Sequence, residues 1–235
     1  MSRVVSRGRF RFMKTFGLVG AAAVAAVLLL AVPASSQQPP IKLAIVTELT
    51  GGISGPGTNW KEAVLMAVYE MNAKGGILGR KIETSVYDTQ SDPPTSVAVM
   101  RRALSEKPFA ILGTVYSSNT VANMHLPQQA GVPQITGSEA AVITQKSNPN
   151  IFRASFTQAF SMAKVAKWMA EDLKAEKVVI IWANTAFGKG GRDTFMKEWQ
   201  ERGKSVVADV STELGQVDFT AELTRIKNGG TRNLF

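Results

Sequence analysis

The sequence predicts an α/β protein with two doubly wound parallel-sheet lobes, and three observations lead to this class. From residue 41 onward, short runs rich in β-branched residues alternate with longer runs of helical period. Glycines and small hydroxyl residues follow several of the predicted strands. The alternation pauses at residues 148–155 and then resumes. Alternating strands and helices favour a parallel sheet covered on both faces, and the pause divides the chain into two such units.

The first lobe is expected over residues 37–152. Its strands are predicted at residues 41–47, 81–88, 109–113 and 132–136, and its helices at residues 59–73, 94–106 and 118–130. One stripe of the first helix is apolar at helical spacing and is expected to face the core: Ala63, Met66, Ala67 and Met71. The sequence "NAKGGILG" then ends this helix, because glycine readily adopts the left-handed conformation of a helix stop.

The second lobe is expected over residues 153–235. Helices are predicted at residues 158–174, 187–202 and 219–228, and strands at residues 177–183 and 205–210. The chain stops at "NGGTRNLF", where another strand is expected. The sequence therefore predicts an incomplete second lobe in a C-terminally truncated chain. Such a chain would bind its ligand weakly, because half of the binding cleft would be missing.

The N-terminus has the order of a signal peptide. A basic segment without acids comes first, then the apolar residues 16–34, then the small and polar residues "VPASSQQPP". This order predicts export to the periplasm with removal of residues 1–36, by cleavage after Ala34 or Ser36. The alternative is a transmembrane anchor, because the apolar run is nearly long enough to span a bilayer.

Composition excludes several classes of function. The chain has no cysteine and one histidine, His125, so thiolate chemistry, disulfides and multi-histidine metal sites are excluded. No G-x-S-x-G sequence is present, which argues against an α/β hydrolase. Five positive charges lie in residues 1–36, which leaves +4 of the formal +9, and no basic cluster with interleaved aromatics remains. The sequence thus predicts no enzyme, no metal, no cofactor and no nucleic-acid partner.

Glycine-rich and hydroxyl-rich segments follow three of the predicted strands. They are "TELTGGISGPGTNW" (47–60), "GTVYSSNTVANM" (113–124) and "TGSEAA" (136–141). The first matches neither G-x-x-x-x-G-K-[ST] nor G-x-G-x-x-G, so a nucleotide loop is not indicated. Loops at the carboxyl ends of parallel strands meet at one edge of a sheet, where ligands bind. Helix capping alone would explain any one of these serines, but together they favour a small anionic ligand.

Two other candidates have simpler structural interpretations. Asp88 and Asp92 could be a carboxylate pair for acid–base chemistry, but a strand end followed by a proline-terminated turn explains them as well. His125 lies in a predicted helix without a partner at a meaningful spacing, which favours packing or surface exposure.

The motifs together resemble those of the periplasmic solute-binding proteins of branched-chain amino acid ABC transporters. The resemblance covers residues 41–230 and is carried by "LTGGISGPG", "AVYEMNAKGGILGRKIE", "YDTQSDP", "AILGTVYSSNT", "NPNIFRAS", "FGKGGRDTF" and "VDFTAELTRIK". Asn72, Gly75, Gly76, Gly79 and Asp88 match the family pattern N-x-x-G-G-x-x-G…D. The resemblance implies a type I periplasmic-binding fold that closes over a small amphipathic solute between two lobes. It further implies a monomer that delivers the solute to a membrane permease.

The resemblance also implies site residues. Ser117 is similar to the serine that binds the ligand carboxylate, and Tyr116 is expected to line the pocket. The segment Ser138, Glu139 and Ala140 resembles the one that holds the ligand's amino and carboxylate groups. Phe187 takes the place of an aromatic from the second lobe, and Gly55 lies in the segment that resembles the first-lobe loop beside the side-chain pocket.

Two alternatives stay open at this point. Ala140 stands where amino-acid binders often have threonine, and the acid that pairs with the ligand ammonium would fall beyond residue 235. Glu139 is a candidate replacement for that acid, and the alternative is an exposed acid at a helix N-terminus. The function also has an alternative, a ligand-sensing module of the same fold that regulates another protein.

Overall fold

The computed structural model describes residues 38–228, and its strands form two parallel sheets. The first sheet has the order β2-β1-β3-β4-β5 and the second pairs β6 with β7; every pairing is parallel. The strands are β1 (Ile41–Thr47), β2 (Ile82–Asp88), β3 (Ala110–Leu112), β4 (Gln134–Thr136), β5 (Ile151–Arg153), β6 (Lys177–Ala183) and β7 (Ser205–Thr212). The predicted fold class, α/β with parallel sheets, is confirmed. The predicted signal peptide and the expected C-terminal interruption lie outside the described residues.

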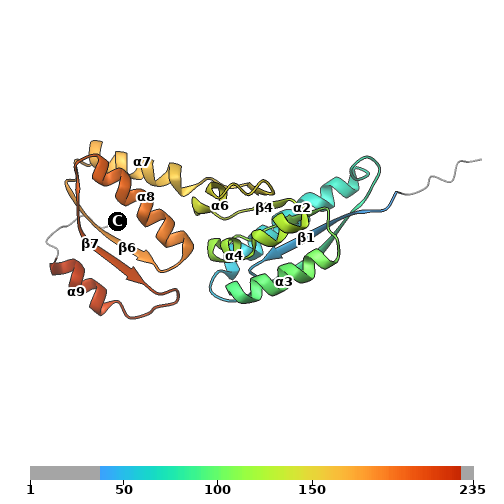
Figure 1. Ribbon diagram of the computed structural model, residues 1–235, viewed down its shortest axis with the longest axis horizontal. Coiled ribbons are helices and arrows are strands. Elements are labelled where there is room, and N and C mark those ends of the chain that lie inside the picture. The colour runs from blue at the N-terminus through green and yellow to red at the C-terminus, as the bar shows by residue number, and fades with distance from the viewer. Residues whose placement is uncertain (1–37, 229–235) are drawn as a thin grey trace, which may run out of the picture. The chain divides into compact units, whose positions relative to one another are not determined.

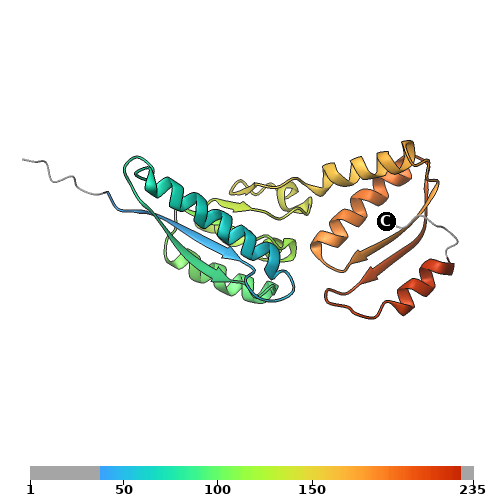
Figure 2. The same cartoon turned by 180° about the vertical axis from the view of Figure 1, so that it is seen from behind.

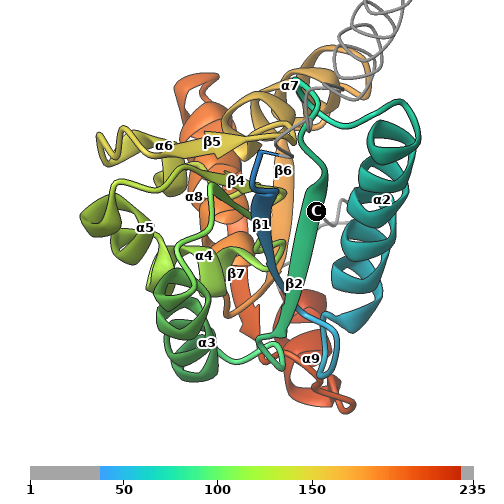
Figure 3. The ribbon, with the colours of Figure 1, turned by 90° about the vertical axis from the view of Figure 1, so that its right-hand side faces the viewer.

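Helices flank the five-stranded sheet on both sides. Figure 3 shows α2 (Ser54–Ala73) on one side of β1 and β2, with α3 (Pro93–Ser105), α4 (Ser117–Asn123) and α5 (His125–Ala130) on the other. The short helix α6 (Val142–Gln145) lies between β4 and β5 in the sequence (Figure 1).

The two-stranded sheet has its own helices (Figure 2). They are α7 (Gln158–Glu171), α8 (Ala186–Glu201) and α9 (Thr220–Asn228). The core between α7, α8 and the sheet is built around Trp199. This residue is fully buried, stacks on Phe195 at 5.5 Å and donates its indole N–H to the carbonyl of Ser205 at 3.0 Å. Among residues 38–228, none of the helices combines the length and the apolar character needed to cross a bilayer.

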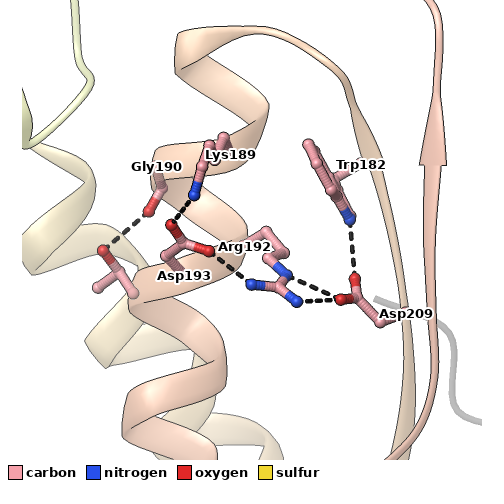
Figure 4. A network of polar contacts seen from close by, with 7 residues as sticks. Trp182, Lys189, Gly190, Arg192, Asp193 and Asp209 are labelled. Carbon is pink, nitrogen blue, oxygen red and sulfur yellow. Dashed lines mark hydrogen bonds and ion pairs between the residues drawn. The ribbon is translucent and has the colours of Figure 1, made fainter.

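A charged network joins α8 to the two-stranded sheet (Figure 4). Asp209 on β7 accepts hydrogen bonds from Trp182 on β6 at 2.8 Å and from the Nε of Arg192 on α8 at 2.9 Å. Arg192 also donates to Asp193 at 2.7 Å, and Lys189 donates to the other oxygen of Asp193 at 2.6 Å. The hydrogen bonds from Arg192 hold the pKa of Asp209 below its ordinary value, although partial burial opposes this shift.

The predicted elements are all present, with three corrections. The helix expected at residues 118–130 is interrupted at Met124, because Pro127 has no N–H to donate to the carbonyl of Asn123. The pause at residues 148–155 contains β5, which is only three residues long and has no readable period. The lobe division after residue 152 falls within β5, and it stays a prediction.

The third correction concerns α2. The helix begins at Ser54 and not at residue 59, so two of the glycines expected in a loop lie in its first turn. The predicted core stripe is exposed, with Met66 63% accessible. The half-buried side is formed by Val64, Leu65 and Val68. Both sides of the helix carry apolar residues, so the sequence period could not decide which side faces the sheet.

Candidate functional site

The candidate site is built at the carboxyl ends of β1, β3 and β4, where the segments after parallel strands converge. Ser117 is the first residue of α4 and is only 2% exposed. Its Oγ accepts a hydrogen bond from the amide N–H of Ala140 at 3.3 Å, which brings the segments after β3 and β4 together. The hydroxyl hydrogen of Ser117 remains a donor. Tyr116, the preceding residue, is half-buried.

The hydroxyl of Ser138 makes its hydrogen bonds inside the protein. The residue is fully buried, and its Oγ lies 2.6 Å from the Oγ1 of Thr120 and donates to the carbonyl of Val115 at 2.8 Å. Thr120 Oγ1 also lies 2.5 Å from the Oγ1 of Thr114. The Ser138 hydroxyl therefore holds the loop after β4 against the segment after β3, inside the protein.

Arg153 shapes the loop that contains Glu139. Its guanidinium donates to the carbonyl of Ser138, to the carbonyl of Ala140 at 3.0 Å and to the hydroxyl of Thr144 at 3.1 Å. Burial lowers the pKa of Arg153, but the neighbouring charge of Glu139 opposes this change. Through two of these hydrogen bonds, Arg153 fixes the carbonyls on both sides of Glu139.

Glu139 is half-buried and lies before α6, outside any helix. Burial raises the pKa of its carboxyl, and the charge of Arg153 offsets part of the increase. This environment differs from that of an exposed acid at a helix N-terminus. Ala140 is fully buried, so only its main chain is available for contacts.

The second part of the site comes from the start of α8. Thr185 caps this helix by accepting from the N–H of Gly188 at 3.0 Å, and Phe187 in its first turn is 46% exposed. The amide N–H of Ala186 donates to the Oγ of Ser118 at 3.1 Å. This hydrogen bond connects the first turn of α8 with the first turn of α4.

Gln158 connects the same start of α8 with the loop after β4. Its amide N–H donates to the carbonyl of Glu139 at 3.1 Å, and its Nε2 donates to the carbonyl of Phe187 at 2.7 Å. The structure thus brings the segments of Ser117, Glu139 and Phe187 into one set of contacts.

Gly55 is not linked to this set by any hydrogen bond recorded for residues 38–228. It lies exposed in the first turn of α2, and a Cβ at this position would meet nothing within 4 Å. The neighbouring Gly57 is different, because a Cβ there would lie 2.0 Å from the carbonyl oxygen of Glu48. The close approach of the Glu48 backbone therefore explains why position 57 is a glycine. Packing gives no reason for a glycine at position 55.

Glu48 is a buried acid that the sequence analysis missed. Its carboxylate is fully inaccessible, and it accepts from the amide N–H of Val115 at 3.1 Å and from the side-chain amide of Asn119 at 2.9 Å. These bonds attach the end of β1 to α4 and to the segment that precedes it. An acid directly after an apolar strand was the available signal in the sequence.

The other acidic candidates have structural roles. Asp88 accepts from the backbone N–H groups of Leu49 and Gln90 at 2.9 and 2.8 Å and from the hydroxyl of Thr50 at 2.7 Å. Burial would raise its pKa, but these hydrogen bonds hold it below its ordinary value. Asp92 caps α3. The described part of the chain holds no cluster of three or more His, Asp or Glu suited to a metal ion.

An open depression of about 600 Å³ lies elsewhere, along α8. Its lining residues all belong to that helix: Arg192, Asp193, Met196, Lys197, Gln200 and Glu201. Because one helix surface forms all of it, it does not enclose a ligand, and the convergent loops remain the better candidate site.

The chain is similar to known proteins of one family. Residues 40–235 match the family described as periplasmic binding protein. A leucine-, isoleucine-, valine-, threonine- and alanine-binding protein of Pseudomonas aeruginosa is 26% identical over 196 residues, which cover 83% of this chain and 52% of that protein. The chain therefore spans about half the length of the curated relatives it matches.

Two solved structures of solute-binding proteins are also similar to this chain, and the chain again covers about half of each. The branched-chain amino acid transporter substrate-binding protein of Streptococcus pneumoniae, in complex with isoleucine, has a TM-score of 0.73 and 29% identity, over 82% of this chain and 54% of that one. An ABC-transporter solute-binding protein of Rhodopseudomonas palustris, in complex with 4-hydroxybenzoate, has a TM-score of 0.74 and 28% identity, over 84% and 53%. The solutes named for these proteins are an aliphatic amino acid and an aromatic acid.

Proposed function

The chain belongs to the periplasmic binding protein family, and from this we propose that it is an exported solute-binding protein of an ABC importer. The solute is a branched-chain amino acid or a related amide or aromatic acid. It is held between two lobes and delivered to a membrane permease by a monomeric protein in the periplasm. Residues 1–36 serve as the cleaved signal peptide in this proposal. The family consists of binding proteins and not of enzymes.

One observation carries the proposal: a hydroxyl donor stands where the segments after β3 and β4 meet. Ser117 Oγ accepts from Ala140, and no acceptor for its hydrogen is recorded within residues 38–228, so this hydrogen can be donated to a ligand oxygen. The half-exposed ring of Phe187 supplies an apolar surface from the start of α8. A donor beside an aromatic surface suits a solute that has a carboxylate at one end and an apolar group at the other.

The test is calorimetric titration of the full-length protein with L-leucine, L-isoleucine and 4-hydroxybenzoate. Removing the hydroxyl in Ser117→Ala should weaken binding by about 1–3 kcal/mol, or roughly 5- to 150-fold, because the hydrogen bond is made to a charged carboxylate. Ser161→Ala is the matched control, since the Ser161 hydroxyl is buried on α7 without a recorded partner. Absence of binding across the panel contradicts the function, and equal affinity in Ser117→Ala contradicts the role of Ser117.

Glu139 gives the proposal a second part, the recognition of an amine. Its half-buried carboxyl lies beside Arg153, whose donors serve the carbonyls of Ser138 and Ala140, and an ammonium group would stabilise its charged form. In Glu139→Gln, affinity for L-leucine should fall several-fold, while affinity for 4-methylpentanoate, which lacks the amine, should not. Glu83→Gln, at an exposed acid on β2, is the control. An equal loss for both compounds would show that Glu139 does not recognise the amine.

A further inference from the structure

Gln158 is placed so that it touches both halves of the candidate site. It is the first residue of α7 and is 2% exposed. Its backbone N–H is bound to the carbonyl of Glu139 at 3.1 Å, and its side-chain Nε2 to the carbonyl of Phe187 at 2.7 Å. One residue therefore joins the loop after β4 to the first turn of α8.

The second turn of α8 is built around this side chain. A Cβ at Gly190 would lie 2.7 Å from the Oε1 of Gln158, and a Cβ at Gly191 would lie 2.9 Å from its Nε2. Neither distance is compatible with a side chain larger than hydrogen unless the amide moves. The amide of Gln158 thus packs directly on the backbone of this turn.

Stability alone does not account for an amide at this position. Its Oε1 is buried and has no hydrogen-bond partner among the described residues. A buried acceptor without a partner is unfavourable, and an apolar side chain of similar volume would avoid that cost. What an apolar residue could not do is donate a hydrogen bond to the carbonyl of Phe187.

We propose that Gln158 is a positioning residue of the solute site. It acts through Phe187: by holding the carbonyl of Phe187, it fixes the first turn of α8 against the Glu139–Ala140 loop, so that the aromatic ring and the loop keep one geometry around the solute. This inference rests on the proposed function for its effect on binding. The connection between the two segments can be tested without any ligand.

The binding test uses L-leucine, the full-length protein and two variants. Gln158→Leu should bind about fivefold more weakly or worse, because the donor is lost, while its melting temperature is maintained or raised. In Gln158→Glu the introduced carboxyl can donate only when it is protonated, and burial favours that form. Affinity relative to wild type at the same pH should therefore be low at pH 8 and recover as the pH is lowered to 5. Gln129→Glu, at an exposed position of α5, should show a constant ratio.

Hydrogen exchange tests the connection independently of binding. In Gln158→Leu the amides of residues 187–190 should exchange faster than in wild type, whereas those of residues 195–200 should not change. A constant affinity ratio in Gln158→Glu, wild-type affinity in Gln158→Leu, or unchanged exchange at residues 187–190 would each overturn the proposal. If the wild type binds none of the panel, the proposed function fails, and hydrogen exchange alone then decides whether Gln158 holds α8.

Discussion

The Ser138→Ala variant tests whether the hydroxyl at the centre of the candidate site serves the fold. The two shortest hydrogen bonds of this hydroxyl are to the carbonyl of Val115 at 2.8 Å and the hydroxyl of Thr120 at 2.6 Å, and the carbonyl of Thr114 lies farther away at 3.1 Å. Each typical hydrogen bond contributes about 1 kcal/mol to stability, so the loss of both gives about 2 kcal/mol. Thr120 has a second hydroxyl partner in Thr114 and can redirect its hydrogen, but the carbonyl of Val115 loses its close donor. The unpaired carbonyl of Val115 costs as much as about 1 kcal/mol more, so the total loss of stability is about 2–3 kcal/mol.

Urea denaturation of the full-length protein and its variants measures this difference. The midpoint should fall while the slope of the transition stays constant, because the unfolded surface is unchanged. Ser161→Ala makes the same chemical change at a buried hydroxyl without a recorded partner, and alanine has the higher helix propensity on α7. It should leave stability unchanged or raise it slightly. A loss below about 0.5 kcal/mol in Ser138→Ala, or equal losses in both variants, would refute the reasoning.

Two further predictions concern stability. Gly57→Ala should destabilise the protein by about 1–3 kcal/mol, because its Cβ would lie 2.0 Å from the carbonyl oxygen of Glu48. Gly55→Ala places its Cβ in open space and should stabilise the protein by up to about 1 kcal/mol. Thermal melts of the two variants measure these effects, and similar changes in both would contradict the packing argument. Arg192 holds the pKa of Asp209 below its ordinary value of 3.8, so the stabilisation from this pair is complete above that value and is lost as the pH falls through the lowered folded-state pKa. Asp209→Asn should therefore be less stable than wild type at pH 7 and approach it in acid, as followed by urea midpoints; a constant difference would contradict the assignment.

The order of the elements could be predicted from the sequence because each long element carries its own signal. In the strand Ile41–Thr47 the residues from Leu43 to Val46 are all apolar and the last four residues are buried, as expected for a strand inside a parallel sheet. The helix Ala186–Glu201 has a side-chain cap at Thr185 and apolar residues at helical spacing. Signals of this kind are local. The three-residue strand Ile151–Arg153 is too short to have a period, and the two apolar sides of Ser54–Ala73 gave no basis for choosing the inner one.

The candidate site was predicted only in part because its contacts are not local. Ser117, Glu139 and Phe187 are site candidates because short motifs of the sequence resemble those of a known family. Gln158 acts on a carbonyl 29 residues away, and Glu48 on an amide 67 residues away. No spacing rule connects such pairs, because their proximity depends on how the strands are ordered in the sheet.

The packing of Gln158 on α8 has a consequence for how this protein can change its sequence. A Cβ at Gly190 would lie 2.7 Å from the Oε1 of Gln158, so an alanine at 190 requires either a shift of this amide or a shorter residue at 158. The two positions should therefore covary among homologues, although they are 32 residues apart. A library that varies them jointly should be enriched in an alanine at 190 combined with a shorter residue at 158, because Gly190→Ala alone crowds the amide of Gln158.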